Sequence, residues 1–535
     1  MWARQSFPEE ERELQRKAVQ VFTAYIRLNS LRRPEALHAG IYHPCHYGET
    51  KRMLETALET EKLSCQVMEE MKDNRPYYSM VHYPAMASMN LLKMHLYAGK
   101  NHHYAAQGRK AANLYGELVQ ECIRLDRKYQ EEWALFREGK WNGMQMAPHI
   151  GFTKWNEDDC RYPVVMKVEP VGHPVMSVSR GDREETATKK YGEPMVIAVP
   201  DFMDAGCEKM TLEIGNGGYG RFRYCITVNS VEGLAETEDG GEENAKLVIN
   251  GESAAEAVNN EKRVTKAGGK SLRALPEWLE IFPMEGTVES LQEVSLICRR
   301  EKLPLEKQTV SLSVTDGETK VTVEVSGQAV KGCDTALTLP PMTFFPRKGV
   351  VTIGAEHYCR KKDTEKGGFQ VIEDYGKYGC GVKVFPGTAA FGEEEERPEL
   401  VYRFLAEETG EYQVELYTAP ANPLVNGESV NLTVSSGEKS VKAQLIPADF
   451  CSGDSGDDRW AEPALDKVRK TCVKLPFRKG VQELAIGAME AGITLERIQI
   501  YQAGKAVEDA YLGPEESWHE RQGNGSHLRF PGQGS

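Results

Sequence analysis

The hydrophobic periodicity of the chain changes once along its length, from the 3.6-residue period of helices to the two-residue period of strands. Up to about residue 138, apolar residues recur on one face of successive segments, as Leu14, Ala18 and Val21 do. From about residue 162, short alternating runs such as KMTLEIGN and RFRYCITV are separated by Gly, Asp and Pro. The change of period predicts a helical region followed by a strand region.

The helical region is predicted to be an antiparallel bundle. Its first helix opens at Ser6, with a glutamate three residues later in capping-box spacing and Pro8 in the first turn. Further helices are expected near residues 50–72 and over residues 77–98, the latter broken or bent at Pro84, and a longer helix follows. Because short links join these amphipathic segments, a bundle with the apolar stripes as its core is favoured.

The strand region is long enough for two β-sandwiches. Its clearest hairpin, residues 309–327, has two alternating runs around Asp316-Gly317. A linker with several prolines, residues 338–349, precedes a second set of strands. We therefore predict a multidomain α+β protein without a (β/α)8 barrel. Its expected parts are a helical bundle and joint at 1–155, a first β-sandwich at 156–337, a second β-sandwich at 338–504 and a disordered tail at 505–535.

Composition argues against several classes of partner. The net charge is −14 and the acidic residues are spread along the chain, whereas nucleic acids and anionic membranes are bound by clustered Lys and Arg. No apolar run approaches the roughly 18 residues of a membrane span, and the N-terminus has no apolar signal core. We expect a cytoplasmic protein with no nucleic acid and no membrane among its partners.

The twelve cysteines are interpreted as reduced thiols. None forms CxxC, and none has a histidine at zinc-finger spacing. The segment HPCH contains His43, Cys45 and His46, but residues so close together in one segment rarely wrap a tetrahedral ion. We expect no metal site and no cofactor.

Sequence motifs of common enzymes are absent. The chain contains no P-loop, no dinucleotide fingerprint after a strand, no GxSxG and no HExxH. The glycine-rich stretch at residues 215–222 precedes a strand rather than a helix, so it is interpreted as a hairpin turn. The two catalytic carboxylates of a glycosidase are defined by their separation in the folded protein. Nothing in the sequence selects two of the 80 acidic residues for this role. We therefore assign no catalytic residue.

The segment KWNGMQMAPHIGFTKWN joins the helices to the strands. Its notable residues are Lys140, Trp141, Met144, Met146, His149, Ile150, Gly151, Phe152 and Trp155. They resemble a signature of glycoside hydrolase family 115, the xylan α-1,2-glucuronidases, which remove (4-O-methyl)glucuronic acid from xylan. LRRPEAL, MVHYPAMASMNLLKMHLYA, PEWLEIFPMEGTV and IEDYGKYGCGV extend the resemblance to about residue 502. The stretch between ITVNS and PEW is longer than expected for the family.

The resemblance implies the C-terminal half of such an enzyme. In the family a (β/α)8 barrel carries the catalytic residues, and a barrel with its preceding domain needs several hundred residues. We expect a portion that scaffolds, forms a homodimer and contacts glucuronoxylan or its oligosaccharides, while hydrolysis needs a barrel-containing chain. A stand-alone carbohydrate-binding protein and a purely structural interaction protein are the alternatives.

The joint offers the first candidate site residues, Trp141, His149 and Trp155. We interpret the tryptophans as large buried surfaces between bundle and sandwich, with Met144 and Met146 filling gaps and the histidine hydrogen-bonded inside. In the second interpretation, the same residues line a glycan cleft, because tryptophan faces stack well on sugars.

The other candidates form two groups. Neighbouring arginines suit a uronate carboxylate, although an ordinary ion pair is the simpler interpretation, and aromatic residues in an apolar helix are either core or cleft. The bundle group is Arg32, Arg33, Glu35, His82 and Tyr83. The alternative of a stand-alone carbohydrate-binding protein requires a platform of exposed rings in the second sandwich. The platform candidates are Phe369, Tyr375 and Trp460.

Overall fold

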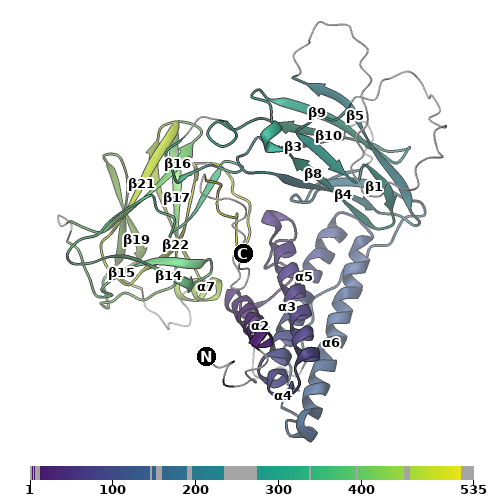
Figure 1. Ribbon diagram of the computed structural model, residues 1–535, viewed down its shortest axis with the longest axis horizontal. Coiled ribbons are helices and arrows are strands. Elements are labelled where there is room, and N and C mark those ends of the chain that lie inside the picture. Colours follow the sequence, from purple (N-terminus) through teal and green to yellow (C-terminus); the bar gives the residue numbers. More distant parts are fainter. Residues whose placement is uncertain are drawn as a thin grey trace. The chain divides into compact units, whose positions relative to one another are not determined.

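A computed structural model describes residues 3, 5, 12–144, 147–151, 159–188, 195–233, 274–335, 339–392, 396–450 and 458–519. The chain divides into two compact units. Unit 1 comprises residues 1–172, 182–184 and 337–535, and unit 2 comprises residues 173–181 and 185–336. Unit 1 thus contains the helices and the C-terminal sandwich, and unit 2 contains the middle sandwich (Figure 1).

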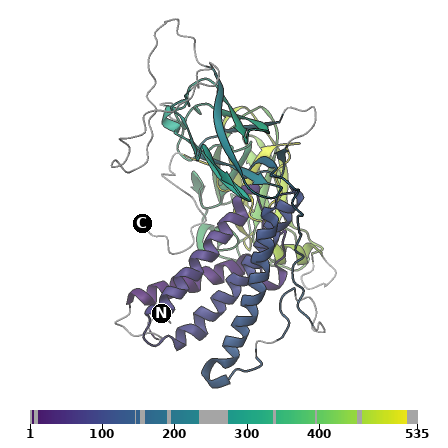
Figure 2. The ribbon, with the colours of Figure 1, turned by 90° about the vertical axis from the view of Figure 1, so that its right-hand side faces the viewer.

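The helices of unit 1 form the expected bundle. Helix α5 packs against both α3 and α6, and α2 packs against α3, so the long helices lie side by side (Figures 1 and 2). The helices are α2 (Arg12–Leu31), α3 (Glu49–Glu70), α4 (Arg75–Tyr77), α5 (Tyr83–Ala106) and α6 (Ala111–Gly139), with short turns η2 (Pro34–Ala36), η3 (His46–Gly48) and η4 (Tyr78–His82). Helix α2 shows why they pack: its buried Leu14, Ala18 and Val21 recur at helical spacing. No helix in the described ranges combines the length and the apolar character that a membrane crossing requires.

Helical structure is continuous from residue 75 to residue 106, and the predicted break or bend at Pro84 corresponds to a π-helical turn directly before this proline. The π-helical turn η4 precedes α5, and Pro84 lies in the first turn of α5. A proline inside a helix removes one hydrogen bond and crowds the preceding turn, and the wider π-helical turn accommodates both effects. Helix α5 then continues to Ala106.

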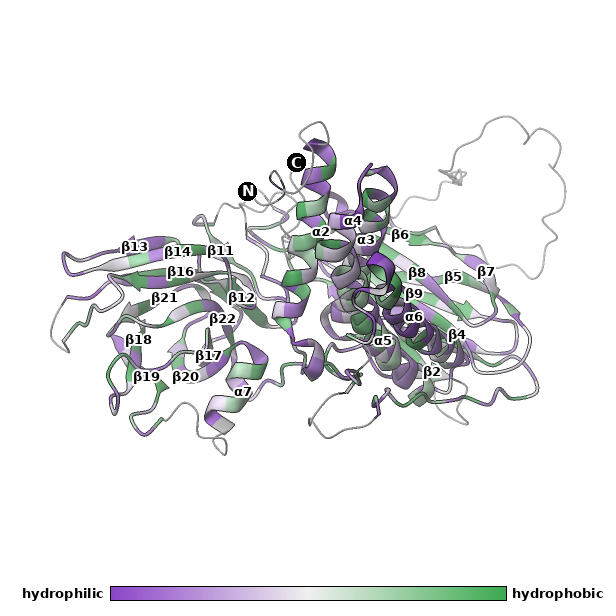
Figure 3. Cartoon of the chain, turned by 90° about the horizontal axis from the view of Figure 1, so that it is seen from below, coloured by the Kyte–Doolittle hydropathy of each residue, from purple (hydrophilic) through white to green (hydrophobic). Residues whose placement is uncertain are grey.

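The C-terminal part of unit 1 is a β-sandwich of two six-stranded sheets. Its inner faces bury alternating residues, as in Leu400, Tyr402 and Phe404 of β16, and Figure 3 shows these strands rich in hydrophobic residues. One sheet runs β11 (Thr343–Phe344), β16 (Glu399–Ala406), β21 (Gly480–Ala488), β18 (Val430–Ser436), β19 (Lys439–Ile446), with β13 (Arg360–Lys362) beside β16. The other runs β14 (Gly368–Tyr375), β15 (Gly379–Phe385), β22 (Thr494–Gln502), β17 (Gly410–Thr418), β20 (Arg469–Phe477), with β12 (Val350–Gly354) beside β22. Helix α7 (Asp458–Asp466) lies between β19 and β20 in the chain.

Unit 2 has two five-stranded sheets with one shared hydrophobic core. The predicted hairpin is confirmed as β9 and β10, with Gly317 at a φ of 98° in the turn. One sheet runs β2 (Thr186–Thr188), β1 (Met176–Arg180), β4 (Lys209–Asn216), β8 (Leu291–Cys298), β6 (Leu279–Phe282). The other runs β3 (Val196–Phe202), β10 (Lys320–Gly327), β9 (Gln308–Thr315), β5 (Phe222–Glu232), β7 (Glu285–Val288). As predicted, no sheet of the described residues closes into a (β/α)8 barrel.

The segment before unit 2 belongs with the bundle, although the first sandwich was expected to begin at residue 156. Asn101 Nδ2 donates to Met166 O at 2.8 Å, and Asn113 Nδ2 donates to Val168 O at 2.8 Å. Asn101 Oδ1 also accepts the backbone amide of Met166, and Asn113 Oδ1 accepts that of Val168. These paired bonds fix an extended segment along α5 and α6, so unit 2 begins at His173.

Residues 505–519 are packed, although the tail was expected to be disordered from residue 505. Leu512 is 3% exposed, and the amides of Leu512 and Gly513 donate to the carboxylate of Glu49. The carbonyl oxygen of Trp518 accepts the amide of Phe345 at 3.0 Å. The backbone groups of this segment have hydrogen-bond partners in both the bundle and the C-terminal sandwich, which explains why the segment is ordered. Residues 520–535 lie outside the described residues.

Candidate functional site

A pocket of about 490 Å³ opens in the helical bundle of unit 1. Side chains of α2, α5 and α6 line it, together with Ser79 of η4 and His149 from the segment after α6. Its volume lies within the roughly 300–1,000 Å³ of small-molecule sites. The pocket is therefore the candidate functional site.

One wall of the pocket is aromatic. The rings of Tyr83 and Trp133 stack with centroids 4.4 Å apart and an interplanar angle of 25°. Tyr78 and Phe136 extend this cluster beyond the pocket lining: the ring centroid of Tyr78 lies 6.3 Å from that of Trp133 and 4.8 Å from that of Phe136. The π-helical turn η4 explains this cluster: residues five apart diverge in an α-helix, whereas a π-helical turn brings Tyr78 and Tyr83 back toward one side.

The pocket lining also contains a polar pair, Asp126 and His149. His149 Nε2 lies 3.0 Å from Asp126 Oδ1, and His149 Nδ1 lies 3.0 Å from the carbonyl oxygen of Ala147. Both ring nitrogens therefore face acceptors, which favours the imidazolium form. The bond to Asp126 raises the pKa of His149 to about 9. Asp126 also accepts a 3.0 Å hydrogen bond from Gln130.

We expect the stabilising effect of His149 to depend on pH. Its pKa is raised in the folded state, so its contribution is fully present below the ordinary value of 6.5 and is lost as pH rises through about 9. The side chain is 40% exposed, so the expected difference between wild type and His149→Gln is only about 0.5–1 kcal/mol. Urea unfolding at pH 6 and pH 10 measures it. An equal difference at both pH values would contradict the ion pair.

Two predicted site residues, Tyr83 and His149, line the pocket. His82 instead bonds Ser64 Oγ through Nδ1 at 2.9 Å, and burial lowers the pKa of His82 to about 4. Trp141 is half-buried, with Lys140 Nζ 4.8 Å from its ring centroid. Trp155 lies outside the described residues. The roles of all these residues in binding stay predictions.

At Met144 the joint differs from the tight packing expected of it. Met144 is 65% exposed and fills no gap, and Met146 lies outside the described residues. Gly151 has a φ of 66°, and a Cβ there would lie 2.6 Å from Arg161 O. The glycine is therefore required where Arg161 N donates to Ile150 O at 2.7 Å.

The predicted arginine group is not brought to the pocket. Arg32 Nη1 donates to Asp466 Oδ1 of α7 at 2.8 Å, and Arg32 Nε donates to Ala36 O. Arg33 and Glu35 are exposed. Arg32 therefore joins the bundle to the C-terminal sandwich through an ion pair, and a carboxylate-binding role for the group stays a prediction.

Among the three platform candidates, the prediction that Phe369 is an exposed ring was wrong. It is 4% exposed and belongs to the hydrophobic core of the C-terminal sandwich. Strand alternation turns Phe369 inward, and Gln370, which follows it in β14, is exposed. Tyr375 and Trp460 are 36% and 41% exposed, and their role as a platform stays a prediction.

Sequence reasoning missed Asp126, Gln130 and Trp133 of the pocket. Helix α6 is rich in charged residues and mostly hydrophilic in Figure 3. Its polar face therefore did not stand out in the sequence as a binding surface. A signal was nevertheless present, because these residues stand at i, i+4 and i+7, on one helical face. A tryptophan on that otherwise polar face was the feature that could have indicated a binding site.

Comparisons with known proteins agree with the C-terminal sandwich. Residues 343–516 match the model of the glycosyl hydrolase family 115 C-terminal domain, which confirms the predicted resemblance for that part of the chain. The match includes residues 505–516 of the packed tail segment. No curated protein matches the chain.

Solved structures with similarity to the chain include an enzyme and carbohydrate-binding modules. The enzyme is a family GH115 4-O-methyl-α-glucuronidase, BtGH115A, with specificity for decorated arabinogalactans (12% identity, TM-score 0.44). The match covers 92% of this chain, which spans 40% of the length of that enzyme. A family 35 module from Clostridium thermocellum matches over 29% of this chain and 98% of its own (10% identity, TM-score 0.21). Module CBM6cm-2 of Cellvibrio mixtus lichenase 5A, in complex with cellotriose, matches over 29% and 97% (18% identity, TM-score 0.19).

Proposed function

We propose that this chain is the non-catalytic portion of a family 115 glycoside hydrolase and that its bundle pocket binds a sugar unit of the polysaccharide substrate. The family-model match at residues 343–516 supports the assignment to such an enzyme. The observation that carries the binding site is that the stacked rings of Tyr83 and Trp133 line the same pocket as the Asp126–His149 pair.

The chemistry of the pocket suits a neutral sugar. A pyranose ring offers an apolar C–H face to an aromatic wall and hydroxyl groups to a polar edge. The carboxylate of Asp126 already balances the imidazolium of His149, so no unpaired positive charge is provided by this pair for a uronate. Glucuronoxylan is the proposed glycan, and the pocket takes an unsubstituted xylose unit rather than the glucuronic acid.

Hydrolysis is assigned to a barrel outside these residues. The resemblance places the catalytic residues of the family in a (β/α)8 barrel, and the sheets of the described ranges form none. We expect the purified chain to release no glucuronic acid from aldouronic acids unless a barrel-containing chain is added. Release above a heat-killed control by this chain alone would overturn the assignment.

Binding is tested by affinity electrophoresis in glucuronoxylan and by calorimetry with xylo-oligosaccharides. Trp133→Ala should weaken binding at least about fivefold, if stacking of a sugar on one ring contributes the roughly 1–3 kcal/mol that stacking of a nucleic-acid base on an aromatic side chain does. Trp460→Ala is the matched control, because this exposed ring lies on α7 of the C-terminal sandwich. No binding by wild type, or wild-type affinity in Trp133→Ala, would contradict the pocket assignment.

The second candidate function is a carbohydrate-binding protein that acts through the C-terminal sandwich. The exposure of Tyr375 and Trp460 favours it. In that case Trp460→Ala, and not Trp133→Ala, abolishes retardation in the glucuronoxylan gel. Homodimer formation is proposed from the family resemblance alone and is measured by light scattering after gel filtration.

A further inference from the structure

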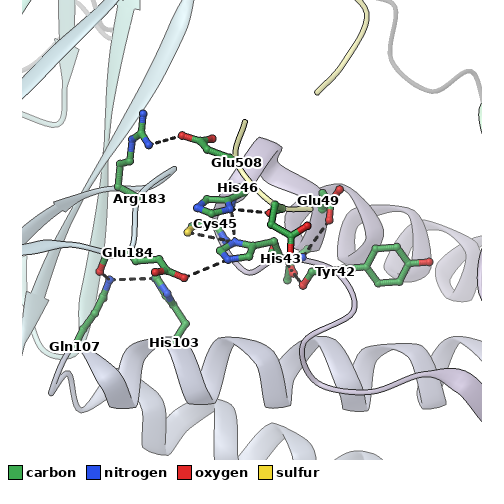
Figure 4. A network of polar contacts seen from close by, with 12 residues as sticks. Tyr42, His43, Cys45, His46, Glu49, His103, Gln107, Arg183, Glu184 and Glu508 are labelled. Atoms are coloured by element: carbon green, nitrogen blue, oxygen red, sulfur yellow. Dashed lines mark hydrogen bonds and ion pairs between the residues drawn. The ribbon is translucent and has the colours of Figure 1, made fainter. Parts of the chain in front are cut away.

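The segment HPCH gathers three metal-ligating side chains at one point of unit 1. His43, Cys45 and His46 each offer a ligand atom, and these atoms all lie within 4.8 Å of one another. Figure 4 shows the two imidazole rings against each other with the thiol beside them; the ring centroids are 3.5 Å apart and the rings are nearly parallel, at 6°.

We propose that His43, Cys45 and His46 bind one divalent transition-metal ion, with zinc as the best match. The ligand atoms are His43 Nδ1, Cys45 Sγ and His46 Nε2, and a water molecule completes a tetrahedron. Imidazole nitrogen and thiolate sulfur are the donors that zinc prefers. Cys45 binds as the thiolate and gives its proton to solvent.

The spacing of two of these atoms already fits a metal site. His43 Nδ1 and Cys45 Sγ are 3.5 Å apart. Zinc bonds of about 2.1 Å to nitrogen and 2.3 Å to sulfur give a tetrahedral edge of about 3.6 Å. Nδ1 also accepts the backbone amides of His46 at 2.9 Å and Cys45 at 3.3 Å. Metal binding displaces those two amides and turns one of the two imidazole rings, because rings stacked in parallel planes cannot both direct a nitrogen lone pair at one ion.

The outer nitrogens of both histidines have the partners that metal-bound histidines use. His43 Nε2 lies 3.2 Å from Glu184 Oε1, and His46 Nδ1 lies 2.9 Å from the carbonyl oxygen of Asp509. A carboxylate and a carbonyl on the outer nitrogens place protons there and leave His43 Nδ1 and His46 Nε2 as the unprotonated atoms. Each histidine therefore presents one unprotonated nitrogen, which is the atom that a metal ion binds.

The proposed site differs from the expectation, made from the sequence, that the HPCH segment holds no metal. The HPCH segment was judged too short to surround an ion, but Glu184 and Asp509 come from distant parts of the chain and orient its ligands. Bound metal would tie residues 43–46 to the Arg183–Glu184 and Glu508–Asp509 segments of unit 1.

The test uses the full chain, stripped with a chelator and then titrated with Co²⁺ or Zn²⁺ alone. We expect one metal per chain by elemental analysis and a thiolate-to-cobalt charge-transfer absorption. Cys45→Ser should remove that absorption and weaken zinc binding at least about 100-fold, and Glu184→Gln should weaken it about tenfold. Cys472→Ser, at an exposed cysteine, is the matched control and should change neither.

Circular dichroism of each variant verifies that the fold is intact. If a ligand variant unfolds, Glu184→Gln, which keeps the side-chain volume, provides the test instead. The proposal is overturned if the stripped wild-type chain takes up no stoichiometric metal. It is also overturned if Cys45→Ser retains the charge-transfer absorption, or if Cys472→Ser loses it.

Discussion

Replacing Glu49 with alanine should destabilise unit 1 by about 3–5 kcal/mol and free residues 508–515 from the bundle. The Glu49 side chain lies at the start of α3 and is fully buried. Its carboxylate accepts the amides of Leu512 and Gly513 at 2.5 and 2.8 Å. It also accepts the amides of Tyr511 at 3.2 Å and His43 at 3.1 Å. Alanine leaves these backbone donors without the acceptor, and an unpaired buried donor costs about 1–3 kcal/mol.

Hydrogen exchange read by mass spectrometry measures the release directly, and urea unfolding gives the loss of stability. Peptides that cover residues 508–515 should exchange much faster in Glu49→Ala, whereas residues 516–518 keep their bonds to β12. Glu59→Ala, at an exposed position of the same helix, is the control and should change stability by no more than about 0.5 kcal/mol. A Glu49→Ala protein with wild-type exchange in this segment would show that the carboxylate does not hold it.

The second large effect is expected in unit 2, at the buried ion pair of Arg180 and Asp201. The nitrogen and oxygen atoms are 2.8 Å apart, and the two side chains are 8% and 3% exposed. Arg180→Leu should destabilise unit 2 by about 3–5 kcal/mol, because it leaves the Asp201 carboxylate buried without its counter-charge. Arg180 Nη1 also donates to Ala198 O at 2.9 Å, and that bond is lost as well.

A double-mutant cycle separates the charge from the packing. The double variant Arg180→Leu/Asp201→Leu should recover most of the loss, since a buried pair replaced by apolar residues is often neutral. Guanidinium unfolding of the four proteins supplies the cycle, with peptides of α5 in hydrogen exchange as an internal reference for unit 1. If the double variant is as unstable as the single one, the charge does not explain the effect.

Local patterns predicted the elements well because the elements depend on neighbours in the sequence. The Asp316-Gly317 turn is one case: Asp316 Oδ1 accepts the amides of Glu318 and Thr319, a motif contained within four residues. The change of period likewise placed the bundle before the sandwiches. Pro84 indicated a distortion of its helix, but the sequence alone did not show whether a break, a bend or the observed π-helical turn would result.

The pocket could be predicted only in part, because it depends on which helices become neighbours. Tyr83 and His149 were selected for their residue types, but Asp126 and Trp133 reach them through the packing of α5 on α6 and the fold-back of the segment after α6. Phe369 was misplaced for a related reason. Its strand has polar residues on both sides, so the sequence alone did not determine which face of the sheet turned inward.

The packing of residues 516–518 has a consequence for recombinant fragments of the C-terminal sandwich. Strand β12 pairs with β22 on one side, and on its other side Thr352 exchanges hydrogen bonds with Ser517 while Gly354 N donates to Glu516. A fragment cut after β22 would therefore present an open strand edge, which is a template for self-association. Soluble fragments of this sandwich should retain the chain through His519.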